Sequence, residues 1–531
     1  RSPLCLLCTT VPVSGGAECE FGVVDMPVRT MLKGLLTSTT RKLVAEFMGT
    51  FLLVLTVGCN VQAARTDAGT GVFAALSIGS LLMVMIYALG PISGGHFNPA
   101  VTLACLCSGK CTVVDAILYA LTQILAGIVG SLSFGALYGN GIPFGPNRVQ
   151  LAMFMWYQVL AVELLFTAML CFVVLNTACV KKPNQYFGLA IGFVIVSGGN
   201  AGGWISGGAF NPAVSLGLDV SDLSSVAGSF GWSLSYIAAQ ALGSLVAAAL
   251  FYVVRPEEFG VDVAADSWRA WAARLTSEFV GTFMLVLTVG LNVLESQVNA
   301  DDPLNEAAVL GIAATLMSMI FAIGPVSGGH LNPAVTVAIF ASGRGLVSRT
   351  ALGWYCLTQL VAGFCGAWVY TFICDWRVFE LGPYGDFSWG GVTAAEFAYT
   401  LVLVFVVLSC ATVRNGAHTA DTFALAIGFS IVAGGYSVGH ISGAALNPAV
   451  AFGIDVSQAL VGGSFWKSLP YSAIHMLASV AAAVLFWVTH EDEYEDGAEA
   501  ETAGGKEREM SERREGAGGQ GAEGQTAGVD G

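Results

Sequence analysis

Charged residues are scarce in this chain: 11% of its 531 residues are Asp, Glu, Lys or Arg, and 55% are hydrophobic. Soluble globular proteins carry about 25% charged residues, so this composition excludes that class and indicates a polytopic membrane protein. The net charge of −15 is misleading, because the segment from Glu491 onward alone holds 13 acidic and 4 basic residues. The remainder is only mildly acidic, and we predict no nucleic-acid partner.

The sequence also lacks the pairing of cysteine and histidine that predicts a zinc site. Its 13 cysteines are scattered, mostly inside apolar segments, where cysteine is typical of packing positions. We therefore predict no metal site, no cofactor and no enzymatic activity.

What the sequence does contain is one short pattern, Asn-Pro-Ala, four times over, each copy between a glycine-rich segment and a short apolar run. Asparagine caps helices and proline suits the first helical position, so each copy predicts a helix N-terminus. The apolar runs last about 10 residues, which is half of what spans a bilayer. The four half-helices would begin with Asn98, Pro99, Ala100; Asn211, Pro212, Ala213; Asn332, Pro333, Ala334; and Asn447, Pro448, Ala449.

The motifs define a double repeat. The motif spacing is about 235 residues between two modules and about 114 residues between the two halves of each. Apolar runs predict three full spans per half, hence six spans and two half-helices per module. Two of these runs, 186–196 and 423–432, look short. Since three is odd, the second half of each module must enter the membrane in the opposite orientation, which makes each module an inverted repeat.

We expect the following organisation: a cytoplasmic extension over 1–40, a first module over 41–254, a linker over 255–269, a second module over 270–490 and a disordered acidic tail over 491–531. The Lys and Arg residues of the short loops concentrate on the side of the N-terminus. Since basic loops stay in the cytoplasm, both chain ends are predicted to be cytoplasmic in a multi-pass membrane protein. The sequence leaves open whether this is the plasma or the vacuolar membrane.

An inverted repeat brings the N-termini of its two half-helices together near the middle of the membrane. Each N-terminus carries roughly half a positive charge, so two of them facing one lumen repel cations. Asn98 and Asn211 can each also offer an amide N–H to a passing neutral molecule, which interrupts a proton-conducting chain of waters. This chemistry suits a passive pore for water and small neutral solutes.

These motifs, together with the Ala-Glu-Phe-x-Gly-Thr-Phe segment that begins at Ala45, resemble those of the aquaporin (major intrinsic protein) family. The resemblance covers nearly all of 41–490, twice over. It implies an all-α polytopic membrane protein made of two aquaporin-like modules, each of six transmembrane helices plus two half-helices. It also implies tetrameric assembly in single-module members, so a tandem chain is expected to form a homo-oligomer, a dimer with four pores.

The resemblance places a second constriction at fixed offsets from each Asn. Water-selective members have an arginine three residues after the second Asn, and usually a histidine twelve before it. This chain has valine and glycine there, as plant vacuolar (tonoplast-type) members have valine, and we therefore predict a wider, uncharged filter. The filter positions are Ile78, Gly199, Gly208 and Val214 in the first module and Ile312, Gly435, Ala444 and Val450 in the second.

One glutamate lies inside the first span of each of the four halves. An ionisable residue at such a place in a membrane is functional by default. The resemblance implies instead that Glu46, Glu163, Glu278 and Glu396 brace the half-helix loops, and we favour that role over a proton relay. Two histidines, His96 and His330, stand two residues before an Asn, and we interpret them as pore-lining or packing residues, with pH gating as the alternative.

Two other functions remain open. The chain could be a strict water channel, or a secondary transporter, because transporters are also built from inverted repeats with broken helices. A transporter needs coupling-ion sites, and one glutamate per half is a poor set. We therefore expect a passive channel for water and for candidates such as glycerol, urea, ammonia or peroxide. Its expected partners are these solutes, membrane lipid and a second copy of the chain.

Overall fold

The computed structural model describes residues 37–66, 71–139, 141, 145–146, 148–221, 226–298, 307–414 and 422–494. Most of the predicted extension and of the predicted tail lies outside these residues. Within the described ranges the chain is all-helical, and twelve helices are long and apolar enough to cross a membrane. The predicted fold class is confirmed.

The first module contains six long helices and two half-helices. The long helices are α2 (Ser38–Thr66), α4 (Ala74–Ser93), α6 (Val113–Tyr138), α8 (Trp156–Thr177), α9 (Phe187–Ser206) and α11 (Val226–Val254). The half-helices are α5 (Pro99–Cys107) and α10 (Pro212–Ser221), and a short α7 (Arg148–Met153) precedes α8. A 3-10 turn, η1 (Pro256–Phe259), follows α11 within the predicted linker.

The second module repeats this order. Its long helices are α12 (Trp268–Val298), α13 (Ala308–Ser327), α15 (Arg349–Ile373), α16 (Trp389–Ala411), α17 (Phe423–Ser442) and α19 (Ser468–Thr489). Its half-helices are α14 (Pro333–Ala341) and α18 (Pro448–Leu460). The 3-10 turn η4 (Glu491–Glu493) follows α19, so the first residues of the predicted tail are ordered.

The two spans predicted as short are in fact full length. Helices α9 and α17 have 20 residues each and continue through segments whose glycines had suggested loops. The glycines serve packing: a Cβ on Gly192 would lie 2.5 Å from the carbonyl oxygen of Gly79, so α9 and α4 cross too closely for any side chain. Gly199 and Gly435 therefore lie on helices, and the non-helical approach to each motif is only about five residues long.

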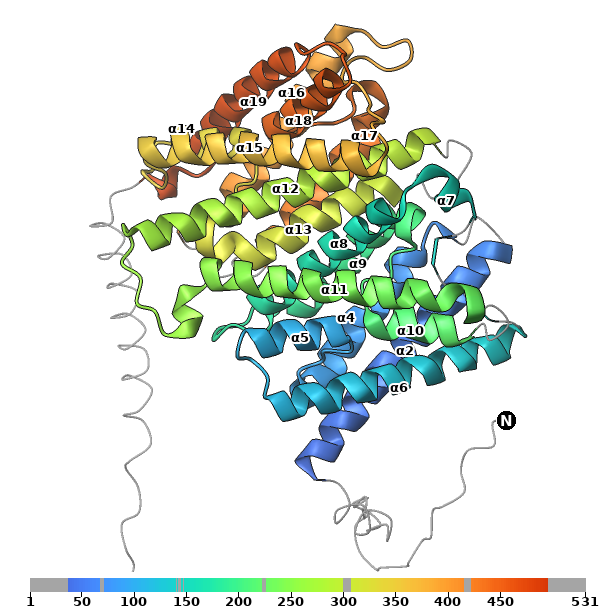
Figure 1. Ribbon diagram of the computed structural model, residues 1–531. Coiled ribbons are helices and arrows are strands. Elements are labelled where there is room, and N and C mark those ends of the chain that lie inside the picture. The colour runs from blue at the N-terminus through green and yellow to red at the C-terminus, as the bar shows by residue number, and fades with distance from the viewer. Residues whose placement is uncertain are drawn as a thin grey trace, which may run out of the picture.

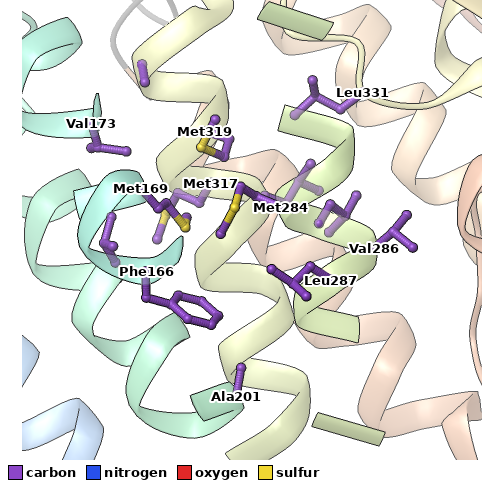
Figure 2. Packing of buried hydrophobic residues seen from close by; sticks show 14 of the residues in the cluster. Phe166, Met169, Val173, Ala201, Met284, Val286, Leu287, Met317, Met319 and Leu331 are labelled. Atoms are coloured by element: carbon purple, nitrogen blue, oxygen red, sulfur yellow. The ribbon is translucent and has the colours of Figure 1, made fainter. Parts of the chain in front are cut away.

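The two modules pack side by side through α8 and α9 of the first and α12 and α13 of the second (Figure 1). Figure 2 shows Met169, Met284 and Met317 turned toward one another between α8, α12 and α13. Methionine fills irregular gaps between helices well, because its side chain is flexible and polarisable. The fused interface is therefore a packed core and not a loose tether.

Polar side chains also join the modules. The hydroxyls of Ser197 and Thr315 form a buried hydrogen bond, and Ser318 Oγ donates to the carbonyl of Ala190 over 2.9 Å. Arg255, where the linker begins, donates to Asn176 in the first module and to the carbonyl of Ala322 in the second. The linker residue thus fixes both modules at once.

A glutamate after the last helix of each module reaches back to the loop behind the first half-helix. Glu258 lies 2.7 Å from Lys110 Nζ and accepts the backbone N–H of Lys181. Burial alone would raise the pKa of Glu258, but these two hydrogen bonds outweigh burial and lower the pKa. In the second module Glu493 occupies the same place and binds Arg344 and the backbone N–H of Arg414.

Candidate pore sites

The two half-helices of the first module meet end to end through their asparagines. Asn98 accepts the backbone N–H of Ala100 through Oδ1, as an N-cap, and donates from Nδ2 to the carbonyl of Phe210 over 2.9 Å. Asn211 caps its own helix in the same way and donates to the carbonyl of Phe97 over 3.0 Å. An asparagine amide has two N–H groups, so each side chain keeps one for the cavity that both line.

The second module repeats this geometry. Asn332 donates to the carbonyl of Leu446 over 3.0 Å, and Asn447 donates to that of Leu331 over 2.9 Å. The sequence predicted the caps and the free N–H groups, but the reciprocal bonds between the half-helices were missed. They depend on the backbone direction of the preceding residue, which carries no sequence signal.

That preceding residue is strained in every copy. Phe97 has φ +48°, in the left-handed region that non-glycine residues rarely adopt. Its backbone is held from both sides, because its N–H donates to Glu46 and its carbonyl accepts from Asn211. The equivalent residues Phe210, Leu331 and Leu446 have φ +46°, +50° and +48°. Such strain persists only where the surroundings fix it, and here it directs the carbonyl across the pore.

The buried glutamates supply that fixation. Glu46 accepts the Ser93 hydroxyl at 2.6 Å, the backbone N–H groups of His96 and Phe97, and the Gln123 amide at 2.8 Å. Each of these donors belongs to the loop or braces it. Glu163, Glu278 and Glu396 accept the corresponding set in the other three halves.

Two further residues of each brace were not predicted from the sequence. Tyr119 donates its hydroxyl to the carbonyl of Ser93 over 2.6 Å, at the end of α4, and Gln123 donates to both Glu46 and Thr102. A signal exists in the Tyr-x-x-x-Gln pattern of the third span of each half. The pattern alone is equally typical of packing, because it does not show which face of a helix meets the loop.

The fourth half has a matched exception. His475 replaces the glutamine and places Nε2 2.8 Å from Glu396. The other three glutamines also contact a hydroxyl four residues after their Asn, whereas Ala451 stands at that position here. Histidine has one fewer N–H on that side, so the absence of the hydroxyl leaves no N–H of the Nε2 edge unpaired, whereas the buried Nδ1 has no partner among the described residues.

Each module encloses a cavity that contains its own predicted filter positions. The first cavity, about 410 Å³, is lined by Ile78, Gly199, Gly208 and Val214 together with both asparagines. The second, about 710 Å³, is lined by Ile312, Gly435, Ala444 and Val450 together with its two asparagines. The rest of both linings is mostly aliphatic.

His96 and His330 line the two cavities and hold equivalent bonds. His96 Nδ1 lies 3.1 Å from Thr102 Oγ1, and that hydroxyl in turn donates to the carbonyl of Asn98. When the Thr102 hydroxyl gives its one proton to Asn98, His96 Nδ1 must carry the ring proton, and Nε2 is then an acceptor. His330 and Thr336 repeat the arrangement at 3.1 Å.

The linings of the two cavities differ at equivalent positions. Trp204 and Asn200 line the first, and His440 and Tyr436 stand at the equivalent places of the second. The segment between α15 and α16 adds Tyr384 to the second cavity, and burial raises the pKa of its phenol to about 12, so it stays protonated. The two pores are therefore not copies of each other.

Comparison with known proteins shows which family this chain resembles. The model of the family "Major intrinsic protein" matches residues 35–232, 189–300, 264–467 and 386–510. A "Glycerol uptake facilitator protein-like 6" from Lactiplantibacillus plantarum is 35% identical over 236 residues, which are 41% of this chain and 100% of that protein. "Aquaporin Z" from Photorhabdus laumondii is 34% identical over 170 residues, covering 29% of this chain and 73% of that one.

"Nodulin-26" from Glycine max is 30% identical over 222 residues, covering 40% of this chain and 78% of that protein. The solved structure of an aquaglyceroporin from Plasmodium falciparum matches with a TM-score of 0.35 and 22% identity, over 42% of this chain and all of that one.

The fold and the family matches define a membrane channel protein. The chain belongs to the major intrinsic protein (aquaporin) family, and the family matches recur along it as two tandem modules.

Proposed function

We propose that each module is a passive pore for water and small neutral solutes, so that one chain carries two pores. The observation that carries this proposal is the pairing of two capped half-helices across one apolar cavity, Asn98 with Asn211 and Asn332 with Asn447. A solute passing the pair meets two N–H donors, while the carboxylates of the four bracing glutamates are engaged with the half-helix loops.

Exclusion of ions follows from the same geometry. The N-termini of α5 and α10 meet at the asparagines, and each carries a partial positive charge that repels cations and protons. The mostly aliphatic lining offers ions little to replace their hydration, and the charged residues Arg65 and Glu295 line the first cavity but not the second. A water molecule needs only the N–H groups of Asn98 and Asn211 and the acceptor Nε2 of His96.

We propose that the filter residues determine which solutes pass. Val214 and Val450 are aliphatic residues at the position that carries arginine in water-selective members, and both line their cavities. Without that fixed charge and its bulk, we propose that glycerol, urea, ammonia or peroxide pass with water. The alternatives are a strict water channel and an ion-coupled transporter.

Stopped-flow light scattering on liposomes that contain the full chain tests this. Water and glycerol should both permeate, without saturation and without an ion gradient. The double variant Val214→Arg, Val450→Arg should keep water flux and lose glycerol flux. If vesicles with the wild-type chain exclude glycerol and urea, the chain is a strict water channel. If flux needs an ion gradient, the chain is a transporter.

We further propose a dimer of chains with four pores. Within the chain, α9 and α13 are mostly buried: 72% and 67% of the residues in their most apolar stretches are buried. In their repeat equivalents, α17 and α4, only 33% and 22% of the corresponding residues are buried. A second copy would cover these faces by repeating the same packing of modules, and a mass of one chain in detergent would contradict it.

The two kinds of interface in that dimer would differ chemically. The fused one contains Ser197, Thr315 and Ser318, whose repeat equivalents on the open faces are Ala433, Leu81 and Val84. The open faces are thus apolar where the fused interface is hydrogen-bonded, which favours alternation of first and second modules around the ring. With twelve spans, an even number, we propose that both ends of the chain are cytoplasmic.

A further inference from the structure

Two cysteines of the first module lie side by side at the end of its first half-helix. The sulfurs of Cys105 and Cys179 are 3.8 Å apart. Cys105 belongs to the last turns of α5 and is fully buried, whereas Cys179, between α8 and α9, is partly exposed. Of the two residues only Cys179 keeps exposed surface, and the Cys105 sulfur lies directly against its sulfur.

The surroundings favour reaction at Cys179. A hydrogen bond from the Cys105 thiol, and then the nearby ammonium of Lys110, lower the pKa of Cys179 against the opposing effects of burial and of Glu258. The thiolate is the nucleophile in thiol chemistry, and a neighbouring lysine is typical of reactive cysteines. Cys105 lies in place to act as the second, resolving thiol.

The second module has no such pair. The repeat equivalents of Cys105 and Cys179 are Ile339 and Thr412, and the Thr412 hydroxyl binds Arg344 instead. One chain therefore contains a pore with the thiol pair and a pore without it.

We propose that Cys105 and Cys179 form a reversible disulfide in response to hydrogen peroxide, and that this bond restricts the first pore alone. The Cys179 thiolate attacks one peroxide oxygen, the O–O bond breaks, and the sulfur becomes a sulfenic acid. The hydroxide that leaves takes up the proton released when the Cys179 thiol ionised and becomes the first water. The Cys105 sulfur then displaces the hydroxyl group, which takes the Cys105 proton and leaves as a second water. Two thiols are oxidised to one disulfide, and one peroxide is reduced to two waters.

The bond acts on the pore through α5. A disulfide holds its sulfurs at about 2.05 Å, so closing the present separation draws the end of α5 toward the segment after α8. The same nine-residue helix begins at the asparagine cap and places Val101 in the cavity wall. Because the thiols lie on the proposed cytoplasmic side, where disulfides are transient, reductants should reverse the change.

The test uses the full chain in liposomes, treated with hydrogen peroxide and then with dithiothreitol. Mass spectrometry of peptides should find Cys105 joined to Cys179. Water permeability should fall by up to half and recover on reduction. Cys105→Ile and Cys179→Thr, which install the residues of the second module, should each abolish both effects. Cys171→Ser, at a buried thiol bonded to Ser244, should leave them unchanged.

A reciprocal variant, Ile339→Cys with Thr412→Cys, should make the second pore sensitive as well. A joined pair other than Cys105 and Cys179, or no joined pair at peroxide levels that oxidise Cys179, overturns the proposal. Loss of water flux that persists in Cys105→Ile overturns it too. The effect on flux rests on the proposed channel function, whereas the disulfide does not. A disulfide in a chain that conducts no water before treatment would therefore mark the failure of the channel function alone.

Discussion

Asn98 and Asn211 are bonded to each other's loops: Asn98 Nδ2 lies 2.9 Å from the carbonyl of Phe210, and Asn211 Nδ2 lies 3.0 Å from that of Phe97. Each asparagine therefore caps one half-helix and holds the other. The two halves of a pore cannot move apart without breaking both bonds, which makes the constriction rigid.

Replacing Glu46 with glutamine should damage the first pore selectively. The carboxylate accepts two backbone N–H groups and two side-chain donors, and a glutamine would turn one acceptor oxygen into a donor facing other donors. Since bonds to charged groups contribute about 1.5–3 kcal/mol each, we expect the free energy of unfolding to fall by about 2 kcal/mol or more. Thermal unfolding in detergent measures this, with Glu278→Gln as the matched variant for the second pore. Unchanged unfolding in Glu46→Gln would contradict the bracing role.

The pair His475 and Ala451 should show coupling. His475→Gln alone gives an amide that binds Glu396 but finds no hydroxyl at position 451, so we expect a loss of about 1 kcal/mol. Adding Ala451→Thr supplies the hydroxyl present in the other module halves and should restore most of that loss. A double-mutant cycle on unfolding free energies measures the coupling, and strict additivity would show that the two positions are independent.

Ala444 should be replaceable by glycine with a gain in pore width. Its φ is +47°, a conformation in which Gly208, its equivalent in the first module, has no steric cost. Relief of strain and the greater freedom of glycine in the unfolded chain roughly cancel, so stability should change by less than about 1 kcal/mol. Urea permeability should rise in Ala444→Gly and fall in the reverse change, Gly208→Ala. Equal urea permeability in all three proteins would remove these residues from the filter.

Glu258 should make the folded protein sensitive to acid. Its pKa is lowered in the folded state, so its contribution is complete above the pKa of the unfolded chain and is lost as pH falls through the folded value. Glu258→Gln should therefore lower stability at neutral pH and lessen its decline in acid. Melting temperatures over a pH series measure this. Glu257→Gln, at a more exposed carboxylate 3.7 Å from Arg255, should change little.

Much of this architecture could be predicted from the sequence, because four Asn-Pro-Ala motifs in register define the half-helices, and an odd number of spans per half requires inversion. The full lengths of α9 and α17 could not. Glycine normally ends a helix, and only the close crossing of Gly192 with Gly79 shows why it continues one here.

The candidate site, too, could be predicted only in part from the sequence. Its lining residues could be named from their offsets to Asn98 and its equivalents, because backbone register fixes them. The bonds between half-helices and the Tyr119 and Gln123 braces depend on how separate helices pack, which is a tertiary property without a local pattern. The asymmetry of the burial of α4 and α13 likewise appears only when the two modules are placed together.

The most direct test is to close each pore separately. Ile78 and Ile312 are equivalent helix residues that line the first and second cavities, and tryptophan at either place should fill the passage. Water permeability per chain is then measured in liposomes for Ile78→Trp, Ile312→Trp and the double variant. Two pores per chain predict a partial loss in each single variant and no residual flux in the double. If one single variant abolishes all flux, or if the double variant still conducts as the wild type does, the chain does not carry two conducting pores.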